Sequence, residues 1–546
     1  MKFRPTPFRA HCLLATTTLT VATLTVAALS LLAAGARVNA AESFDLELRK
    51  RVETGEETGS FQMTRQQQTW QPAETAVVVC DMWDLHHCLN ATKRGAEMAP
   101  RMDRVLKLAR ARGATIIHAP SSCVKFYADH PARKHVQTIP RADTFPTDIG
   151  KWCHIIPSEE QGEYPIDQSD GGEDDDPEEH KKWAEELKAK GLNPRAPWTR
   201  QTKLLTIADK DFISDNGEEI WSILEHRKIK NVVLVGVHTN MCVLGRPFGL
   251  RQMARNEKNV VLMRDMTDTM YNPARRPYVS HFTGTDLIVE HIEKWVCPTI
   301  TSDQLLGGKP FRFKNDTRPH VVALIAEREY KTNQTLPRFA LERLGKDFRV
   351  SFVFANPKDR DDLPGAERLI PTADLLLVSV RRRALNKVQM DALRKHVAGG
   401  KPVVGIRTAN HAFSLRGKEA PKGRFVWERW DRDVIGGHYT NHHGDGPNVK
   451  ITVAKKQANH SILKGVDRND LVGHGSLYVV SPLGPEARPL LLGQIPDKPV
   501  EPIAWTNTTE AGGRVFYTSL GHIEDFQHEA VKQLLDNAIR WAVKTR

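Results

Sequence analysis

The chain has 546 residues, which is enough for two or more domains of ordinary size. It is 40% apolar and 26% charged, a balance typical of globular proteins that excludes wholesale disorder and a polytopic membrane protein. The formal charge of +12 is scattered among acids and does not form a basic stripe with interleaved aromatic residues, so no nucleic-acid partner is predicted.

The first 40 residues differ from the rest of the chain. MKFRPTPFR has three basic residues and no acid, residues 13–35 are uncharged and apolar, and Val38-Asn39-Ala40 ends in a residue that signal peptidase accepts. This pattern predicts a signal peptide over residues 1–40 and an exported protein, periplasmic or extracellular, with no membrane contact after cleavage. The alternative is an uncleaved membrane anchor, since an apolar stretch of about 20 residues can span a bilayer.

Six cysteines follow the predicted signal peptide. Export permits disulfides, but six cysteines in roughly 500 residues do not make a disulfide scaffold. No CxxC pair or Cys/His ladder occurs, so a structural zinc site is not predicted. The six are Cys80, Cys88, Cys123, Cys153, Cys242 and Cys297.

Residues 60–300 alternate strand and helix patterns and are predicted to form the first domain. Since parallel strands need crossover connections, the alternation predicts a parallel sheet with helices on both faces. The predicted strands are 74–81, 114–120, 231–237 and 259–265, and the predicted helices are 97–112, 217–229 and 246–255.

An acidic run, DGGEDDDPEEH, occupies residues 170–180 within this domain. Its dense like charge lacks the glycine-containing spacing of an EF-hand. We therefore interpret it as a solvated loop and not as a cation site.

A linker is predicted at residues 301–318, where periodicity is lost and Gly, Pro and Lys gather. Beyond it, residues 319–546 are predicted to form a second domain. Its predicted strands are 320–327, 349–355, 374–380 and 401–407, and its predicted helices are 385–400 and 527–544. The predicted fold class is α/β with two domains, each a mainly parallel sheet flanked by helices.

Three residues of the first domain are predicted to lie at the carboxyl edge of its sheet and could together perform covalent catalysis. Asp81 closes the first strand, and a buried carboxylate there is costly unless it is used or paired. Cys242 lies at a strand-to-helix turn, where a helix N-terminus would favour the thiolate. Lys210 is the nearest upstream cation, with Lys203 as the other candidate. Asp81 would take the thiol proton, the lysine would hold both groups, and Cys242 would attack an electrophilic carbon.

At these residues the sequence resembles the isochorismatase-like cysteine hydrolase family, which includes nicotinamidases and carbamoylsarcosine amidohydrolase. The resemblance is carried by VVVCDMWD (77–84), GVHTNMCVLGRPFGLRQM (236–253) and VVLMRDMTDT (260–269). It implies a Rossmann-type three-layer sandwich and an Asp81, Lys210, Cys242 triad.

The resemblance also implies the surroundings of the thiol. A cis peptide would join Val237 to His238, and the amides of His238 and Cys242 would form the oxyanion hole, with Trp83 at the substrate. His238 stands where the family usually has a small residue, so it would narrow or polarise the pocket.

A divalent metal stays open as a cofactor, although none is firmly implied. Family nicotinamidases bind metal through an Asp-x-His element and a later His, on a different stretch of chain. Surface or loop histidines are the commoner explanation for such residues. The candidate ligands here are Asp84, His86, His87, His118, His130 and His135.

The second domain resembles the ThuA-like (trehalose utilisation) family, which has a class I glutamine-amidotransferase-like, flavodoxin-type fold without the amidotransferase machinery. The resemblance is carried by GIRTANHAF (405–413), IGGHYTNHHG (435–444) and GGRVFYTSLGHIEDF (512–526). Since no cysteine follows Cys297, thiol catalysis is excluded in this domain. The family's link to sugar metabolism implies a carbohydrate-related ligand. The candidate pocket residues, which could instead be structural, are Arg407, His411, His438, His442, His443 and His522.

The sequence therefore predicts an exported hydrolase that cleaves an amide or other C–N bond of a small-molecule substrate through Cys242. Two alternatives stay open: a catalytically inactive two-domain binding protein, and vinyl-ether hydrolysis by Asp81 without a thiol nucleophile, as in isochorismatase itself. A homo-oligomer stays open as well.

Overall fold

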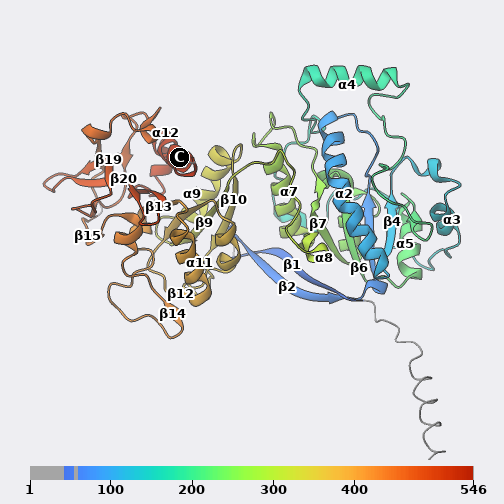
Figure 1. Cartoon of the computed structure of the whole chain (residues 1–546), viewed down its shortest axis with the longest axis horizontal. Helices are drawn as coiled ribbons and strands as arrows, with labels where there is room; N and C mark the ends of the chain where they lie inside the picture. Colours follow the sequence, from blue (N-terminus) through green and yellow to red (C-terminus); the bar gives the residue numbers. More distant parts are fainter. Residues whose placement is uncertain (1–41, 55–58, 445, 545–546) are drawn as a thin grey trace, which may run out of the picture. The chain divides into compact units, whose positions relative to one another are not determined.

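The computed structural model describes residues 42–54, 59–444 and 446–544 (Figure 1). The predicted signal peptide, residues 1–40, lies outside the described residues. Within the described ranges, no helix has both the length and the apolar character needed to cross a membrane.

The first sheet has eight strands in the order β2-β1-β8-β7-β6-β3-β4-β5. Strands β3 to β8 run parallel, as the alternation of patterns predicts, and β1 and β2 add an antiparallel hairpin that the sequence analysis missed. The strands are β1 (Phe44–Glu53), β2 (Phe61–Trp70), β3 (Thr75–Cys80), β4 (Thr115–Ala119), β5 (Phe212–Ile213), β6 (Asn231–Val237), β7 (Asn259–Asp268) and β8 (Thr299–Ile300).

Helices cover both faces of this sheet. Alternate residues of its central strands are therefore buried on opposite sides. In β3, Ala76 and Val78 belong to one apolar cluster with residues of α5, α6 and α7, whereas Val77 and Val79 belong to another with residues of α2. A strand buried on both faces has a continuous apolar sequence, as TAVVVC has. The helices are α2 (Leu89–Ala111), α3 (Pro131–Gln137), α4 (Pro177–Ala189), α5 (Gly217–His226), α6 (Leu250–Arg255), α7 (His281–Trp295) and α8 (Asp303–Leu306).

The second sheet has nine strands in the order β10-β9-β11-β13-β21-β20-β19-β16-β17. Its first five strands in that order are parallel, and the other four extend the sheet antiparallel. The strands are β9 (His320–Ala326), β10 (Arg349–Phe354), β11 (Leu375–Val380), β13 (Val403–Ile406), β16 (Val449–Val453), β17 (Val472–Gly473), β19 (Arg488–Gln494), β20 (Glu501–Thr508) and β21 (Arg514–Thr518).

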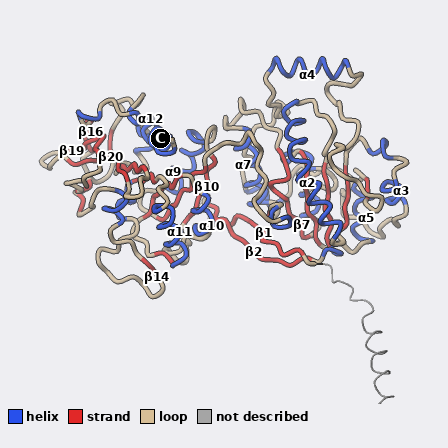
Figure 2. Tube along the Cα trace, in the orientation of Figure 1, coloured by secondary structure: helices blue, strands red, loops and turns tan. Residues whose placement is uncertain are grey.

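The second sheet is also buried on both faces. In β9, Val321 and Ala323 share a cluster with residues of α9 and α12, and Val322 and Leu324 share another with residues of α11. Figure 2 distinguishes the strands (red) from the helices (blue) in both halves of the chain. The helices are α9 (Thr332–Phe339), α10 (Ala366–Leu369), α11 (Lys387–Ala398) and α12 (Glu529–Val543), and two small ladders pair β12 (Leu385–Asn386) with β14 (Arg424–Phe425) and β15 (Asn441–His442) with β18 (Tyr478–Val479).

Tight turns end β3 and β6, the two neighbouring strands at the centre of the first sheet. Asp81 has φ 46°, and the peptide between Val237 and His238 is cis, as the resemblance predicts. Gly236 has φ 110°, and a Cβ there would lie 2.0 Å from the carbonyl oxygen of Cys80. Only glycine lets the two strands approach this closely at the edge where the candidate residues lie.

We expect Gly236→Ala to lower the free energy of unfolding by about 3 kcal/mol or more, because it adds a clash with the Cys80 backbone to a strained φ. Gly113→Ala is the matched control, since Gly113 has φ 96° and no other group lies within 4 Å of the point that its Cβ would occupy. It should cost only about 1 kcal/mol. Equal losses of unfolding free energy for the two variants in chemical denaturation would contradict this, since they would show that the close approach to the Cys80 backbone adds no cost.

Candidate active site

The acid and the thiol predicted from the sequence meet at one edge of the first sheet. Asp81 directly follows β3, and Cys242 lies in a π-helical turn, Thr239–Val243, that follows β6. Because β3 and β6 are parallel neighbours, their carboxyl ends lie side by side. The Cys242 thiol and the Asp81 carboxylate interact electrostatically, and both residues are buried.

The cation beside Asp81 is Arg246. Its Nε lies 3.1 Å from Oδ2 of Asp81, and its guanidinium lies over the ring of Trp152 at 5.2 Å. Arg246 follows Cys242 by four residues, and its amide donates to the carbonyl of Cys242 at 3.0 Å. That spacing puts the two side chains on one face of a helical turn, which is the signal that could have found Arg246 in the sequence.

The predicted role of Lys210 is wrong. Lys210 is exposed in the turn before β5, and β5 runs parallel to β4 and β3. A residue that precedes a parallel strand lies at the amino end of the sheet, which is the end opposite to Asp81. Lys203 is also exposed in a turn, so neither lysine takes the position that Arg246 holds.

Burial controls the charge state of the site. It raises the pKa of the Cys242 thiol, and the neighbouring Asp81 charge raises that pKa further. The expected thiolate at a helix N-terminus is therefore wrong for the resting state, since the thiol keeps its proton at neutral pH. Burial also raises the pKa of Asp81 above its ordinary value of 3.8, against the effect of Arg246. A carboxylate of raised pKa is a stronger base toward the thiol.

His238 lies directly against the thiol. Its backbone amide lowers the pKa of the Cys242 thiol, against the larger effect of burial, so the amide lies close to the sulfur. The imidazole is 3% exposed, and burial lowers its pKa to about 3, so the ring is neutral at physiological pH. The ring of His86 meets it edge-on with centroids 4.7 Å apart. Val237, the other half of the cis peptide, is buried.

Aromatic side chains form one wall near the site. Trp83 is half-buried and stacks on Trp198 with ring centroids 4.6 Å apart, and its Nε1 donates to the carbonyl of Ser121. His86 stacks at 6.0 Å from Trp83 and 5.9 Å from Trp198. Trp198 comes from a distant irregular segment, so no local pattern could have linked it to Trp83.

Four of the candidate metal ligands predicted from the sequence are engaged elsewhere, whereas Nδ1 of the half-buried His87 has no hydrogen-bond partner among the described residues. Asp84 accepts hydrogen bonds from Thr199, and His118 bonds to Gln201 and Asp211. His130 caps α3 by accepting from the amide of Ala132. His135 bonds to the carbonyl of Asp211. These residues therefore serve separate structural contacts.

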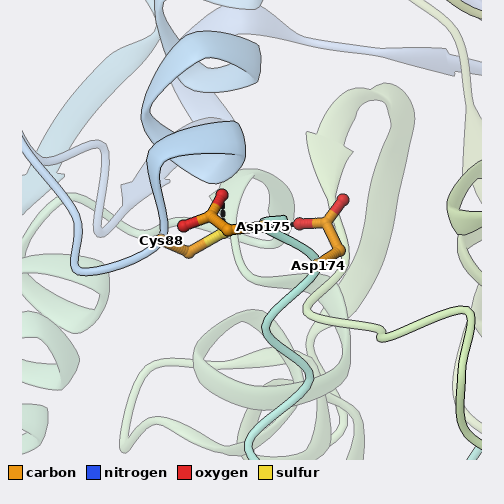
Figure 3. Close-up of side chains that lie close together, drawn as sticks. All are labelled: Cys88, Asp174 and Asp175. Atoms are coloured by element: carbon orange, nitrogen blue, oxygen red, sulfur yellow. Dashed lines mark hydrogen bonds between the residues drawn. The ribbon is translucent and has the colours of Figure 1, made fainter. Parts of the chain in front are cut away.

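Among the described residues, two other groups of side chains have possible metal-ligand atoms within 4.8 Å of one another, namely Cys88 with Asp174 and Asp175, and Glu173 with Asp175 and His180. Figure 3 shows the first group. Asp175 accepts from the amides of Leu89 and Asn90 at the start of α2, and Cys88 bonds to both carboxylates at 3.3 Å. Protein donors already satisfy these carboxylates, so the first group neutralises the N-terminus of α2.

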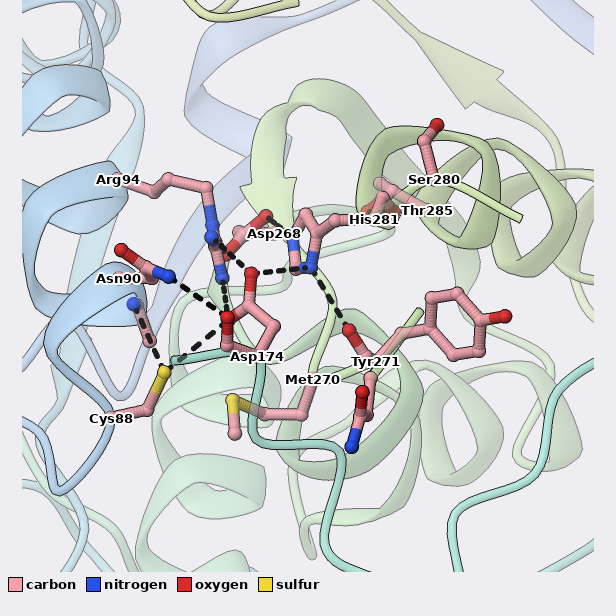
Figure 4. A network of polar contacts seen from close by, with 12 residues as sticks. Cys88, Asn90, Arg94, Asp174, Asp268, Met270, Tyr271, Ser280, His281 and Thr285 are labelled. Carbon is pink, nitrogen blue, oxygen red and sulfur yellow. Dashed lines mark hydrogen bonds and ion pairs between the residues drawn. The ribbon is translucent and has the colours of Figure 1, made fainter. Parts of the chain in front are cut away.

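The prediction of a solvated loop for residues 170–180 is thus wrong at its centre. The side chain of Asp174 is 7% exposed, and it forms an ion pair with Arg94 of α2 at 2.8 Å. Arg94 also contacts Asp268 at 2.7 Å, and His281 contacts Asp268 at 2.9 Å (Figure 4). Although burial opposes ionisation, Arg94 and His281 hold the pKa of Asp268 well below its usual range. This network joins α2, the acidic run, the end of β7 and the start of α7, and its charges act on the imidazole of His238.

The second domain brings together four of its six candidate residues around three tyrosines. Arg407 is buried after β13, and its guanidinium lies 4.2 Å from the Tyr330 ring centroid and 5.0 Å from that of Tyr478. The other contacts to tyrosine rings are made by His411 with Tyr439 at 4.3 Å, His442 with the Tyr439 hydroxyl at 2.6 Å, and His522 with Tyr330 at 5.9 Å.

The remaining two candidates of the second domain have other surroundings. His438 is exposed and forms an ion pair with Asp431. His443 donates its backbone amide to the carbonyl of Leu477. The sequence analysis missed the tyrosines, which come from three separate segments of the chain.

Comparison with known proteins identifies the family of the second domain. The family model described as ThuA, trehalose utilisation, matches residues 321–542. This half of the chain is a ThuA-like domain. A ThuA-like protein of Bacteroides uniformis is 16% identical, with 43% of this chain and 95% of that chain covered and a TM-score of 0.33.

Structures similar to the chain also include proteins of the family that the sequence of the first domain resembles. A cysteine hydrolase from Pseudomonas syringae is 18% identical, with 43% of this chain and 93% of that chain covered and a TM-score of 0.27. An isochorismatase family protein from Burkholderia thailandensis is 14% identical, with 43% and 94% covered and a TM-score of 0.24. No curated protein matches the chain.

The buried ion pair of Asp211 predicts a pH dependence of stability. Although burial opposes ionisation, hydrogen bonds from His118 and Arg110 lower the pKa of Asp211 to about 2, below its ordinary 3.8. A depressed carboxylate pKa stabilises the fold above about pH 4, and this contribution is lost as the pH falls toward 2. We expect Asp211→Asn to remove about 2 kcal/mol of stability at pH 7 and less at pH 3. Urea unfolding at several pH values checks this. Asp209 is exposed, so Asp209→Asn is a control that should leave the free energy of unfolding unchanged at both pH 7 and pH 3.

Proposed function

We propose that the first domain is a cysteine hydrolase that cleaves an amide or other C–N bond of a small molecule. The observation that carries the proposal is the buried, interacting pair of Cys242 and Asp81 at one sheet edge, with Arg246 against the carboxylate. A thiol and a base in hydrogen-bond contact are what nucleophilic catalysis needs. The cation favours the ionised form of Asp81 against the effect of burial, and in this proposal the amides of the turn would hold the negative charge that develops on a carbonyl oxygen.

The reaction would proceed in two steps. Asp81 takes the thiol proton as Sγ bonds to the carbonyl carbon, and the carbonyl oxygen becomes an oxyanion held by the His238 amide. The C–N bond then breaks, the nitrogen leaves with the proton from Asp81, and a thioester on Cys242 is left. Water, deprotonated by Asp81, attacks the thioester, and the acid product leaves as the thiol is restored.

Two neutral imidazoles near the thiol favour a planar, uncharged reacting group. His238 and His86 are both buried, and burial lowers the pKa of each imidazole, so neither ring adds charge beside the thiol. In this proposal Trp83 and His238 contact the substrate. The ThuA-like domain would bind a sugar-related ligand, and export would follow from residues 1–40.

Trapping experiments test the nucleophile. The full chain, incubated with a library of small amides and aldehydes, should form a covalent adduct that mass spectrometry locates on Cys242. Cys242→Ala should abolish the adduct and lower turnover by at least about a thousandfold. Cys297→Ala, at another buried cysteine, is the matched control and should retain both.

Three other outcomes would separate the alternatives. No adduct and no turnover across the library would contradict the proposal and favour a binding protein. Activity that survives Cys242→Ala but not Asp81→Ala would favour vinyl-ether hydrolysis without a thiol nucleophile. Loss of the adduct in Cys297→Ala would place the nucleophile elsewhere.

The positioning role of Arg246 predicts a shift in a pH profile. Removing its charge should raise the pKa of Asp81 further, so the acid limb of Cys242 acylation by p-nitrophenyl acetate should move up by about 1 pH unit or more in Arg246→Gln. Arg246→Lys should restore most of the profile. Lys210→Gln should leave it unchanged, and an effect of Lys210→Gln in place of Arg246→Gln would reverse our assignment of the cation.

A further inference from the structure

A cavity of about 330 Å³ in the ThuA-like domain is lined mainly by arginines. Its lining consists of Arg328, Glu329, Arg360, Arg381 and Arg383. Four cations therefore face one acid, and the cavity has an excess of positive charge. None of these residues contributes to the thiol site, and none was singled out in the sequence.

The cavity lies at the edge of the sheet where ligands of open α/β folds bind. Arg328 follows β9, Arg360 follows β10, and Arg381 and Arg383 follow β11. These three strands are parallel neighbours in the order β10-β9-β11, so the arginines gather at adjacent carboxyl ends. Topology, and not closeness in sequence, assembles them.

Most of this charge has no carboxylate partner. Glu329 forms an ion pair with Arg381 at 3.1 Å. Arg328 donates to the carbonyl of Pro357 at 3.5 Å. Within residues 42–54, 59–444 and 446–544, Arg328, Arg360 and Arg383 form no ion pair.

Arg383 carries its charge into the interior of the domain. It is 4% exposed, its Nη1 donates to the carbonyls of Arg381 and Arg382, and its buried Nε has no hydrogen-bond partner among the described residues. Burial, followed by the charge of Arg360, lowers its pKa to about 10, so the guanidinium stays protonated at neutral pH. A buried charge with an unused donor is costly unless a counterion meets it.

We propose that this cavity binds the anionic group of a small polar ligand, a phosphate ester or a carboxylate. The planar guanidinium forks of several arginines match the oxygens of such groups with two hydrogen bonds each. A phosphate ester has the closer charge match, since it would meet three unpaired cations with up to two negative charges. The proposal goes beyond the thiol chemistry of the first domain and does not depend on it.

Arg382, the residue between the lining residues Arg381 and Arg383, contacts the tyrosine and histidine group of the same domain. Its amide donates to the carbonyl of His411 at 3.3 Å, and its guanidinium lies 5.9 Å from the ring centroid of Tyr439. A ligand held by its anionic group in the cavity could therefore extend its polar body toward these rings. A sugar phosphate or a sugar acid has this combination of groups.

Calorimetric titration of the full chain at constant ionic strength tests the proposal. The probes are inorganic phosphate, glucose 6-phosphate, glucuronate and uncharged glucose. We expect saturable binding of the phosphate probes, tighter than any binding of glucose. Binding of glucuronate but not of phosphate would identify a carboxylate as the anion. The absence of saturable binding by all three anions would overturn the proposal.

Variants locate the binding. Arg328 and Arg360 are exposed, so Arg328→Gln and Arg360→Gln should fold, and each should weaken phosphate binding about tenfold. The exposed Arg432→Gln, outside the cavity lining, is the matched control. Unchanged binding in the first two variants, or an equal loss in Arg432→Gln, would overturn the assignment. Cys242→Ala should bind phosphate like the wild type, which separates this result from the fate of the hydrolase proposal.

Discussion

The first domain depends on the compensation of one buried carboxylate. Asp81 is fully buried at the end of a central strand, and an isolated charge there would cost several kcal/mol. The amide of Ser121 donates to it at 2.8 Å, Arg246 pairs with it, and the Cys242 thiol interacts with it electrostatically. The groups that make the charge tolerable are therefore the ones that nucleophilic catalysis would use.

Buried carboxylates near the site are compensated in the same way. Asp174, Asp175 and Asp268 are buried acids, and each is met by a cation, a histidine or the amides that begin α2. Because these acids come from an irregular segment and from the end of β7, their compensation fixes loops that strand pairing does not reach. His238 thus lies close both to the Cys242 thiol and to this charged network.

The ThuA-like domain shows the opposite balance. Its arginines gather at the carboxyl ends of three parallel strands without enough carboxylates to neutralise them. A fold tolerates an acid met by cations, as at Asp81, and it tolerates excess cations at a rim that water or a ligand reaches. The two domains therefore present different chemistry at equivalent edges of their sheets, a buried thiol with its base in one and open positive charge in the other.

Apolar periodicity alone was enough to predict most of the parallel strands and the helices between them, because a strand buried on both faces must be apolar throughout. It was not enough for β1 and β2, since FQMTRQQQTW has few apolar residues and is stabilised by pairing with β1. The antiparallel extension of the second sheet was missed in the same way.

The sequence by itself determined that Asp81 and Cys242 would share one sheet edge, since each follows a buried strand. Only the tertiary structure decided which cation joins them. Because β5 runs parallel to β4, Lys210 lies at the end of the sheet opposite to Asp81. Arg246 lies one helical turn after Cys242, and there it contacts Asp81. It also decided the thiol's charge state and the arginine cavity, because burial and the order of strands depend on contacts between segments far apart in the chain.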